Sequence, residues 1–254
     1  MLKILMHGAC GRMGRMIARQ AEEMDSVTVT CGVDMRTADD LGFPVFSSLS
    51  DVDEAFDVII DFTNASTLSG LLEYAVEKRV PCVIASTGHT AEQKQQIRDA
   101  AKVTPVFYSA NFSLGVNVLL ALCRRAASAL SESFDIEIVE KHHNQKLDAP
   151  SGTALMLADG IASVLEYEPE YVYTRHDRHE TREKKEIGIS AVRGGTIVGE
   201  HDVIFAGNQE VVSLSHTAYS REIFAVGALK AAQYLADLAP GLYDMESMIE
   251  DRLK

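Results

Sequence analysis

A glycine-rich segment near the N-terminus has residue types that could bind a pyrophosphate. It reads Gly8-Ala9-Cys10-Gly11-Arg12-Met13-Gly14 and lies between an apolar run and a helical pattern. Glycines at a strand-to-helix turn let the backbone approach a pyrophosphate, and the helix N-terminus supplies N–H groups and a positive dipole. Arg12 adds a charge. The spacing is not the commoner Gly-x-Gly-x-x-Gly, and a plain tight turn is the alternative.

An acidic residue at the end of the second apolar run favours dinucleotide binding over a plain turn. Asp34 follows Gly14 by 20 residues, where a carboxylate can accept hydrogen bonds from a ribose. The same carboxylate disfavours a 2′-phosphate, although Arg36 could offset that repulsion. The sequence therefore favours NADH and leaves NADPH open, and an ordinary acid at a strand end is the alternative for Asp34.

A second group of residues suits proton transfer beside an anionic ligand. Histidines titrate near neutral pH, a lysine adds a point charge, and a helix start offers N–H groups to an anionic oxygen. Pro150 and Ser151 predict such a helix start. The candidate residues of this group are His142, His143, Lys146, Ser151, Gly152 and Thr153.

Two other interpretations of the second group stay open at this point. A solvated basic loop is one of them. A metal site that also uses His176 and His179 is the other, but no zinc-type spacing is present and no cysteine is near in sequence. We therefore expect no metal.

The composition limits the ligands. The 254 residues include 24 Lys and Arg against 37 Asp and Glu, which gives a formal net charge of -13. Such a surface repels phosphate backbones, so we expect no nucleic-acid partner, and an anionic ligand needs locally gathered positive charge. No apolar stretch approaches the ~18 residues of a membrane span. Without a secretory cleavage site or a Cys-x-x-Cys pair, the chain is expected to be cytoplasmic.

The first part of the chain must position the glycine segment and Asp34. Short apolar runs alternate with amphipathic segments, a pattern that predicts a parallel sheet covered by helices on both faces. The predicted strands are Leu2–His7, Val27–Val33, Val58–Asp61, Pro81–Ala85 and Pro105–Tyr108, and the predicted helices are Arg12–Met24, Ala65–Lys78 and Thr90–Ala101.

The later part predicts an α+β domain that positions the histidine cluster. Turn signals at Gly194-Gly195 and Gly207-Asn208 predict two antiparallel hairpins. The charged segment Thr174–Lys185 is predicted to be an exposed connection. The predicted helices are Ser113–Leu130, Thr153–Leu165, Ser220–Leu238 and Asp244–Leu253, and the predicted strands are Phe134–His142, Ile187–Val192, Thr196–Phe205 and Glu210–His216.

Over essentially its whole length the chain resembles the 4-hydroxy-tetrahydrodipicolinate reductase (dihydrodipicolinate reductase) family. The string His-His-x-x-Lys-x-Asp-Ala-Pro-Ser-Gly-Thr is highly specific for that family. The matching segments occur in the family's order and are Gly8–Gly14, Ser86–Gly88, Ser109–Ser113, Glu140–Thr153 and Arg193–His201.

The resemblance implies a fold and an activity. Residues 1–112 with 222–254 would form a Rossmann-like parallel-sheet domain, and residues 113–221 an α+β domain with an open mixed sheet that binds substrate and builds a homotetramer. The activity would be NADH- or NADPH-dependent reduction of a cyclic dicarboxylate, 4-hydroxy-tetrahydrodipicolinate, to tetrahydrodipicolinate in lysine and diaminopimelate biosynthesis.

The resemblance also implies roles for individual residues. His142 would be the general acid and Lys146 its charge partner. The residues implied to bind substrate are His143, Lys146, Ser151, Gly152 and Thr153. Those implied to bind the cofactor are Gly8, Ala9, Cys10, Gly11, Arg12, Met13, Gly14, Asp34, Arg36, Ser86, Thr87, Gly88, Ser109, Ala110, Asn111 and Phe112.

Some positions depart from the family pattern or receive no role. Met35 stands where many members have an arginine, which weighs against strict NADPH selectivity. His89 replaces a common aromatic residue, and Arg221 matches a family arginine near the interdomain hinge. A non-catalytic dinucleotide-binding regulator and a related dehydrogenase with another substrate are the alternative functions.

Overall fold

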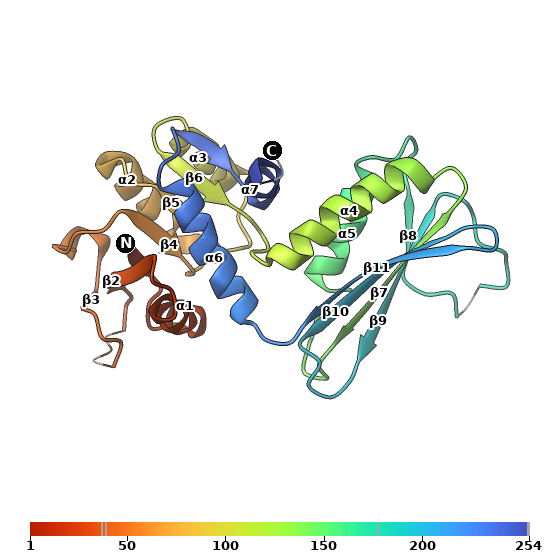
Figure 1. Cartoon of the computed structure of the whole chain (residues 1–254), viewed down its shortest axis with the longest axis horizontal. Helices are drawn as coiled ribbons and strands as arrows, with labels where there is room; N and C mark the ends of the chain where they lie inside the picture. Colours follow the sequence, from red (N-terminus) through yellow and green to blue (C-terminus); the bar gives the residue numbers. More distant parts are fainter. Residues whose placement is uncertain (37, 39, 177, 253–254) are drawn as a thin grey trace. The chain divides into compact units, whose positions relative to one another are not determined.

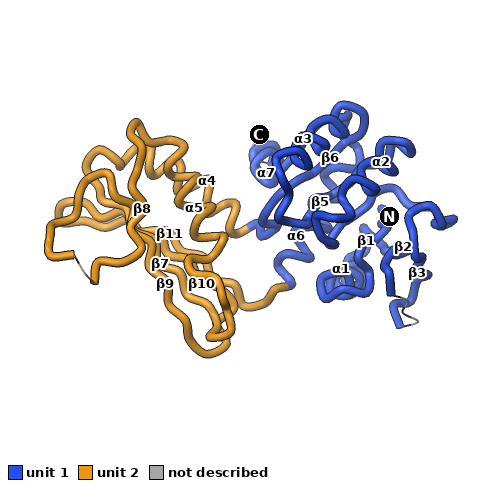
Figure 2. Tube along the Cα trace, turned by 180° about the vertical axis from the view of Figure 1, so that it is seen from behind, with its two compact units in different colours: residues 1–114, 222–254 blue, residues 115–221 orange. Residues whose placement is uncertain are grey.

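The chain divides into two compact units. The structure is a computed structural model that describes residues 1–36, 38, 40–176 and 178–252. Unit 1 is Met1–Leu114 with Glu222–Lys254, and unit 2 is Gly115–Arg221 (Figure 2). The division expected from the sequence differs from these units by residues 113 and 114. The predicted end of the last helix, Leu253, lies outside the described residues.

Unit 1 contains a sheet of seven parallel strands in the order β12-β6-β5-β4-β1-β2-β3. Its core strands are almost entirely apolar because helices cover both faces of the sheet. The strands are β1 (Leu2–His7), β2 (Val27–Val33), β3 (Val45–Phe46), β4 (Val58–Asp61), β5 (Cys82–Ile84), β6 (Pro105–Tyr108) and β12 (Gly241–Tyr243).

Alternate residues of the strands of unit 1 supply two hydrophobic cores. Ile4 and Met6 of β1 belong to the core under α1, α6 and α7, whereas Leu5 belongs to the core under α2 and α3. Helix α6 crosses the first of these faces in contact with α1, β4, β5 and β6 (Figure 1). The helices are α1 (Arg12–Glu22), α2 (Leu68–Lys78), α3 (Ala91–Ala100), α6 (Glu222–Leu235) and α7 (Met245–Arg252), with short 3-10 turns η1 (Leu49–Asp51) and η2 (Ala65–Thr67).

The order of the strands reverses between β1 and β4. From β1 the chain proceeds to β2 and β3 on one side, while β4, β5 and β6 follow one another on the other side. In open α/β sheets, ligands bind outside the carboxyl ends of the strands at such a switch point. The fold therefore places the segment after His7 and the segment after Asp61 at the expected position of a binding crevice.

Unit 2 is built on a mixed sheet of five strands in the order β11-β10-β7-β9-β8. Helices α4 (Leu114–Leu130) and α5 (Gly152–Ala162) supply apolar residues to one core with the buried face of the sheet. Strand β7 is parallel to β9 and antiparallel to β10. The strands are β7 (Asp135–His142), β8 (Glu170–Val172), β9 (Glu186–Arg193), β10 (Gly199–Ala206) and β11 (Val211–Ala218).

The hairpin predicted at Gly194-Gly195 is wrong, whereas β10 and β11 do pair as an antiparallel hairpin. Strand β7 lies between β9 and β10, so the loop after β9 passes the end of β7. Gly194 N–H donates to His142 O over 2.9 Å, and Asn144 N–H donates to Gly195 O over 3.2 Å. The glycines therefore serve a loop that contacts the chain leaving β7, and they do not join two neighbouring strands.

Other differences concern short or charged segments. Strands β3, β8 and β12 were not predicted, because two or three residues are too few to show a periodic pattern. The charged connection is largely exposed, but Arg175 pairs with Glu186 over 2.5 Å and Arg182 with Glu137 over 3.1 Å. Among the described residues, no helix is long and apolar enough to cross a membrane.

Candidate active site

The glycine segment forms a tight turn between β1 and α1. Gly8 has a φ of +88°, and its N–H donates to Val33 O over 2.8 Å. A Cβ at Gly14 would lie 2.3 Å from Gly8 O, so only glycine lets the helix start so close to the turn. No described side chain caps α1 at Gly11. The first N–H groups of the helix can therefore bind an anion, and the turn fits a pyrophosphate.

The carboxylate of Asp34 is fixed beside this turn. Its Oδ2 accepts from Cys10 N–H and its Oδ1 from Arg36 N–H, each over 3.0 Å. The Arg36 guanidinium lies 3.7 Å from Asp34, and its side chain is 71% exposed. Each carboxylate oxygen can accept a second bond, so Asp34 keeps the capacity to bind a ribose. Burial, followed by the charge of Asp34, raises the pKa of the Cys10 thiol.

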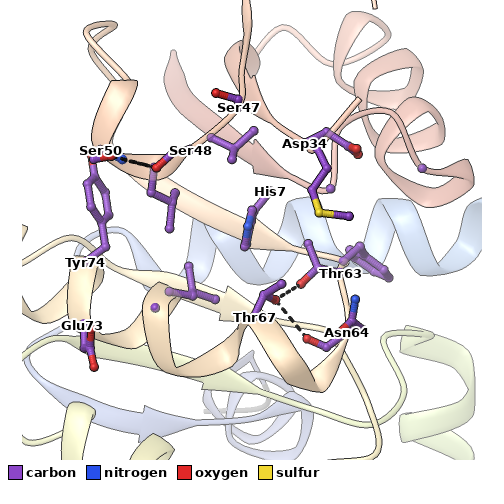
Figure 3. A pocket seen from close by; sticks show the side chains of 18 of the residues that line it. His7, Asp34, Ser47, Ser48, Ser50, Thr63, Asn64, Thr67, Glu73 and Tyr74 are labelled. Carbon is purple, nitrogen blue, oxygen red and sulfur yellow. Dashed lines mark hydrogen bonds between the residues drawn. The ribbon is translucent and has the colours of Figure 1, made fainter. Parts of the chain in front are cut away.

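A pocket of about 710 Å³ opens from the turn across the switch point (Figure 3). The residues Gly8, Gly11, Asp34 and Arg36, which were predicted to bind cofactor, line it. Polar residues that were not assigned from the sequence complete it. These are His7, Ser47, Ser48, Ser50, Thr63, Asn64, Thr67, Glu73, Tyr74 and Glu77. Thr63 and Asn64 could have been found from the sequence, because they lie within three residues of the end of a buried strand, at the sheet's carboxyl edge.

Seven further residues expected to bind cofactor lie on the loops after β5 and β6 and do not line this pocket; they are Ser86, Thr87, Gly88, Ser109, Ala110, Asn111 and Phe112. Ser86 Oγ donates to Asp61 Oδ2 over 2.6 Å, which links the first loop to the end of β4. In the second loop Ser109 Oγ donates to Asn111 O over 2.9 Å. The Phe112 ring lies between two other rings, 6.0 Å from Phe62 and 5.7 Å from Phe107.

The glycine segment itself divides between exposed and core residues. Arg12 is exposed. Ala9 and Cys10 are buried, and Met13 is half-buried against the core under α1. Their side chains therefore stabilise the turn, and the turn offers a ligand its backbone.

The second site begins on β7, where Glu140 and His142 lie on the buried face of the strand. Residues two apart on a strand point to the same side, and His142 Nδ1 lies 2.6 Å from Glu140 Oε2. Glu140 has no exposed surface. Such a pair holds an imidazole in one orientation and in one tautomer.

The carboxylate of Glu140 is held from three directions. Arg193 donates from Nη1 to Oε2 and from Nη2 to Oε1, each over 2.7 Å, and Ser151 N–H donates to Oε1 over 3.0 Å. Burial raises the pKa of Glu140, but the bonds from Arg193, His142 and Ser151 outweigh burial and lower the pKa below its ordinary value. Because the carboxylate is ionised, it can only accept, so His142 Nδ1 carries the proton and donates to it. Nε2 is then left for a ligand.

The environment of His142 opposes its protonation in the free protein. Burial lowers the pKa of His142, and the hydrogen bond and charge of Glu140 only partly offset that effect. The charges of Lys146 and Arg193 lower the pKa further. A Cβ at Gly199 would lie 3.1 Å from His142 Nε2, so the glycine leaves room for the ring. A dianionic ligand would raise the pKa of His142 and favour its charged form.

Cationic and helix-start groups lie next to His142. Lys146 Nζ binds Asp148 Oδ1 over 2.9 Å. Ser151 caps α5, since its Oγ accepts from Ala154 N–H over 3.1 Å, and Gly152 begins the helix. Ser151 Oγ also lies 3.0 Å from His201 Nε2. Burial lowers the pKa of His201 to about 4, so this imidazole is neutral near pH 7.

His143 faces a different pocket within unit 2. That pocket has a volume of about 370 Å³ and is also lined by Asn144, Thr196 and Arg221. Arg221 Nη2 lies 3.4 Å from His143 Nε2. His142 therefore belongs to the Glu140 network, whereas His143 lies in a pocket beside Arg221, a residue to which no role was assigned from the sequence.

Three residues of the His142 network were quoted in the family motifs without a role: Glu140, Arg193 and His201. Glu140 could have been found from its position two residues before His142 on a predicted strand. Arg193 and His201 could not, because the pairing of β7 with β9 and β10 brings them there. Within the described part of the chain, no group of three His, Cys, Asp or Glu residues could hold a metal ion.

The fold and these two sites define a dinucleotide-dependent oxidoreductase with a parallel-sheet unit and a mixed-sheet unit. Two family models match the chain, "Dihydrodipicolinate reductase, N-terminus" over residues 2–112 and "Dihydrodipicolinate reductase, C-terminus" over residues 115–249. The chain belongs to the dihydrodipicolinate reductase family.

Individual relatives agree with this placement. The 4-hydroxy-tetrahydrodipicolinate reductase of Caldanaerobacter subterraneus subsp. tengcongensis is 52% identical over 250 residues, covering 98% of this chain and 99% of the relative. That of Clostridium tetani is 44% identical over 249 residues, covering 98% and 97%. Among solved structures, dipicolinate-bound dihydrodipicolinate reductase from Paenisporosarcina sp. TG-14 is similar with a TM-score of 0.82 at 26% identity, covering 96% and 97%.

Proposed function

We propose that this chain reduces 4-hydroxy-tetrahydrodipicolinate to tetrahydrodipicolinate with NADH or NADPH, in lysine and diaminopimelate biosynthesis. The observation that carries the proposal is the orientation of His142 by the buried Glu140–Arg193 pair, next to Lys146 and the start of α5. Membership of the family supports the reaction, and the site supports the roles of the residues.

The dinucleotide fits unit 1. The turn at Gly8–Gly14 and the open start of α1 would hold the pyrophosphate, and Asp34 with Arg36 would meet the adenine ribose. When bound, the reduced nicotinamide supplies two electrons and a proton as hydride. The segments Ser86–Gly88 and Ser109–Phe112 would contact its nicotinamide end. Both NADH and NADPH are compatible with an Asp34 carboxylate that has an exposed guanidinium beside it.

His142 supplies the second proton of the reduction. The 4-hydroxyl of the substrate leaves as water, which gives a conjugated, doubly unsaturated ring. Addition of hydride to that ring leaves an electron pair that must be protonated, and the oxidised dinucleotide is released. The fixed Nδ1 bond to Glu140 directs Nε2 to that role, and the charge of Lys146 stabilises negative charge as it develops. Neutral His142 is then reprotonated from solvent, so the chain ends the reaction unchanged.

The two carboxylates of the substrate require the cationic and N–H groups of unit 2. Lys146 can exchange its bond to Asp148 for a bond to a substrate carboxylate. The N–H groups at the start of α5, around Ser151, Gly152 and Thr153, can donate to the same carboxylate. His143 is the further candidate for a carboxylate contact. The similar dihydrodipicolinate reductase from Paenisporosarcina sp. TG-14 has dipicolinate bound, which supports a planar dicarboxylate as the ligand class.

Assembly and location are further parts of the proposal. The face of the mixed sheet opposite α4 and α5 carries exposed apolar residues such as Val192 and Val211, which supports the expected homotetramer. We expect the enzyme in the cytoplasm, where its four buried free cysteines stay reduced.

A coupled assay tests the proposed function. Purified protein should oxidise NADH or NADPH when it is supplied with the product of dihydrodipicolinate synthase, and pyridine-2,6-dicarboxylate should compete with the substrate. Lack of turnover with both cofactors at neutral pH and low salt would contradict the reaction. Turnover without competition by the planar dicarboxylate would favour a related dehydrogenase with another substrate.

A further inference from the structure

Four polar side chains are buried together at the carboxyl edge of the parallel sheet. His7 ends β1, Asp61 ends β4, and Ser86 and His89 follow β5. Asp61 has no exposed surface, and the other three are at most 8% exposed. Polar groups this well buried normally need specific partners. Only Ser86 was assigned a role from the sequence.

Asp61 joins two loops. Its Oδ1 accepts from Thr63 Oγ1 over 2.6 Å and lies 2.9 Å from His7 Nδ1, directly before Gly8 of the glycine turn. Its Oδ2 accepts from Ser86 Oγ over 2.6 Å. The carboxylate therefore lies between the turn expected to hold the pyrophosphate and the loop expected to meet the nicotinamide end.

His89 holds the C-terminal end of the loop after β5. His89 Nε2 lies 2.9 Å from Ser86 O, and because a carbonyl can only accept, Nε2 carries the proton. The His89 ring also packs edge-on against Tyr108 with 5.6 Å between ring centroids. Thr87 and Gly88 between these anchors are exposed, and Gly88 has a φ of +81°. A two-residue exposed tip is thus held at both of its buried ends.

We propose that His89 and Asp61 are positioning residues that fix the Thr87–Gly88 tip for the nicotinamide ring of the dinucleotide. The assignment of that end to the tip rests on the proposed function. Holding the tip before binding spares the ligand the entropy of ordering it. Loss of the His89 bond should therefore weaken only those ligands that reach the tip.

The test compares two ligands, NADH and ADP-ribose, which lacks nicotinamide. His89→Phe keeps a ring against Tyr108 and removes the donor, whereas His89→Gln keeps an N–H in place of Nε2. In calorimetric titrations, His89→Phe should weaken NADH about threefold to tenfold, the effect of one hydrogen bond. ADP-ribose should change less than twofold, and His89→Gln should restore most of the NADH affinity.

The outcomes separate this inference from the proposed function. Equal losses for both ligands would show a general effect on unit 1 and overturn the positioning role, as would unchanged NADH affinity. If His89→Phe fails to fold, Ser86→Ala provides the same comparison through the Asp61 bond. If the unaltered protein binds neither ligand, the dinucleotide site itself is wrong and the proposed function fails with it.

Discussion

His142 Nδ1 lies 2.6 Å from Oε2 of Glu140, a carboxylate without any exposed surface. Two bonds from Arg193 hold the same carboxylate. Breaking a buried pair by removing one charge is strongly destabilising, so this arrangement fixes the imidazole firmly. It engages Nδ1 with Glu140 and leaves Nε2 available to a ligand.

Glu140→Gln should change the pH dependence of the enzyme. A general acid must be protonated, so kcat/KM should fall as pH rises through the pKa of His142, which lies below its ordinary value of 6.5. Glu140 raises that pKa by its hydrogen bond and charge. Removing the charge should therefore move the fall in kcat/KM to lower pH.

The pH–rate profile of Glu140→Gln is best compared with that of Glu200→Gln. Glu200 of β10 pairs with Lys141 of β7, and the Glu200 side chain is 30% exposed. Its removal should leave the profile of the unaltered enzyme. A fall at unchanged or higher pH in Glu140→Gln would show that Glu140 does not set the pKa of His142.

Lys146→Gln should weaken substrate binding more than cofactor binding. A charge-assisted bond to a carboxylate contributes about 1.5–3 kcal/mol, so KM for the dicarboxylate should rise at least tenfold. The Kd for NADH should stay within twofold. Lys102→Gln, at a lysine whose side chain is 73% exposed, is the matched control. An unchanged KM in Lys146→Gln would exclude contact with a carboxylate.

Gly14→Ala should damage the dinucleotide site. The added Cβ would lie 2.3 Å from Gly8 O and 2.7 Å from Ala9 O, both backbone atoms. The unfolding free energy in urea should drop by about 1–3 kcal/mol, and NADH affinity should be lost. A Cβ at Gly70 in α2 meets nothing within 4 Å, so Gly70→Ala should not lower stability. Equal stability of both variants would contradict the tight turn.

His201 should make the protein sensitive to acid. Its pKa is about 4 in the folded chain, against 6.5 when exposed. Because the folded pKa is the lower one, the contribution to stability is fully present above pH 6.5 and is lost as pH falls towards 4. The loss amounts to about 3 kcal/mol. Urea unfolding should therefore show a larger fall in unfolding free energy between pH 7.5 and pH 4.5 for the unaltered protein than for His201→Gln. The same fall in both proteins would refute the burial argument.

Much of the parallel sheet could be predicted because each core strand is an apolar run bounded by turn residues. The predicted bounds of Leu2–His7, Val27–Val33, Val58–Asp61 and Pro105–Tyr108 are confirmed. The glycine turn was also evident, since strand, glycines and helix are contiguous in sequence. Local signals of this kind need no knowledge of the tertiary fold.

The polar networks depend on pairing that the sequence does not show. Arg193 lies opposite His142 only because β9 runs parallel beside β7, where a hairpin with β10 was expected. Likewise, His7 and Asp61 meet because β4 returns next to β1. Single polar residues at the ends of separate strands give no periodic pattern, so their partners become visible only in the folded chain.

The most direct test of the proposed mechanism is the kcat of His142→Gln with the dicarboxylate and NADH. Loss of a general acid should lower kcat about 10²-fold or more. The Kd for NADH and the thermal unfolding temperature should stay as in the unaltered protein, and His179→Gln on the charged connection should retain full activity. A kcat close to that of the unaltered protein would contradict the role of His142 as the proton donor.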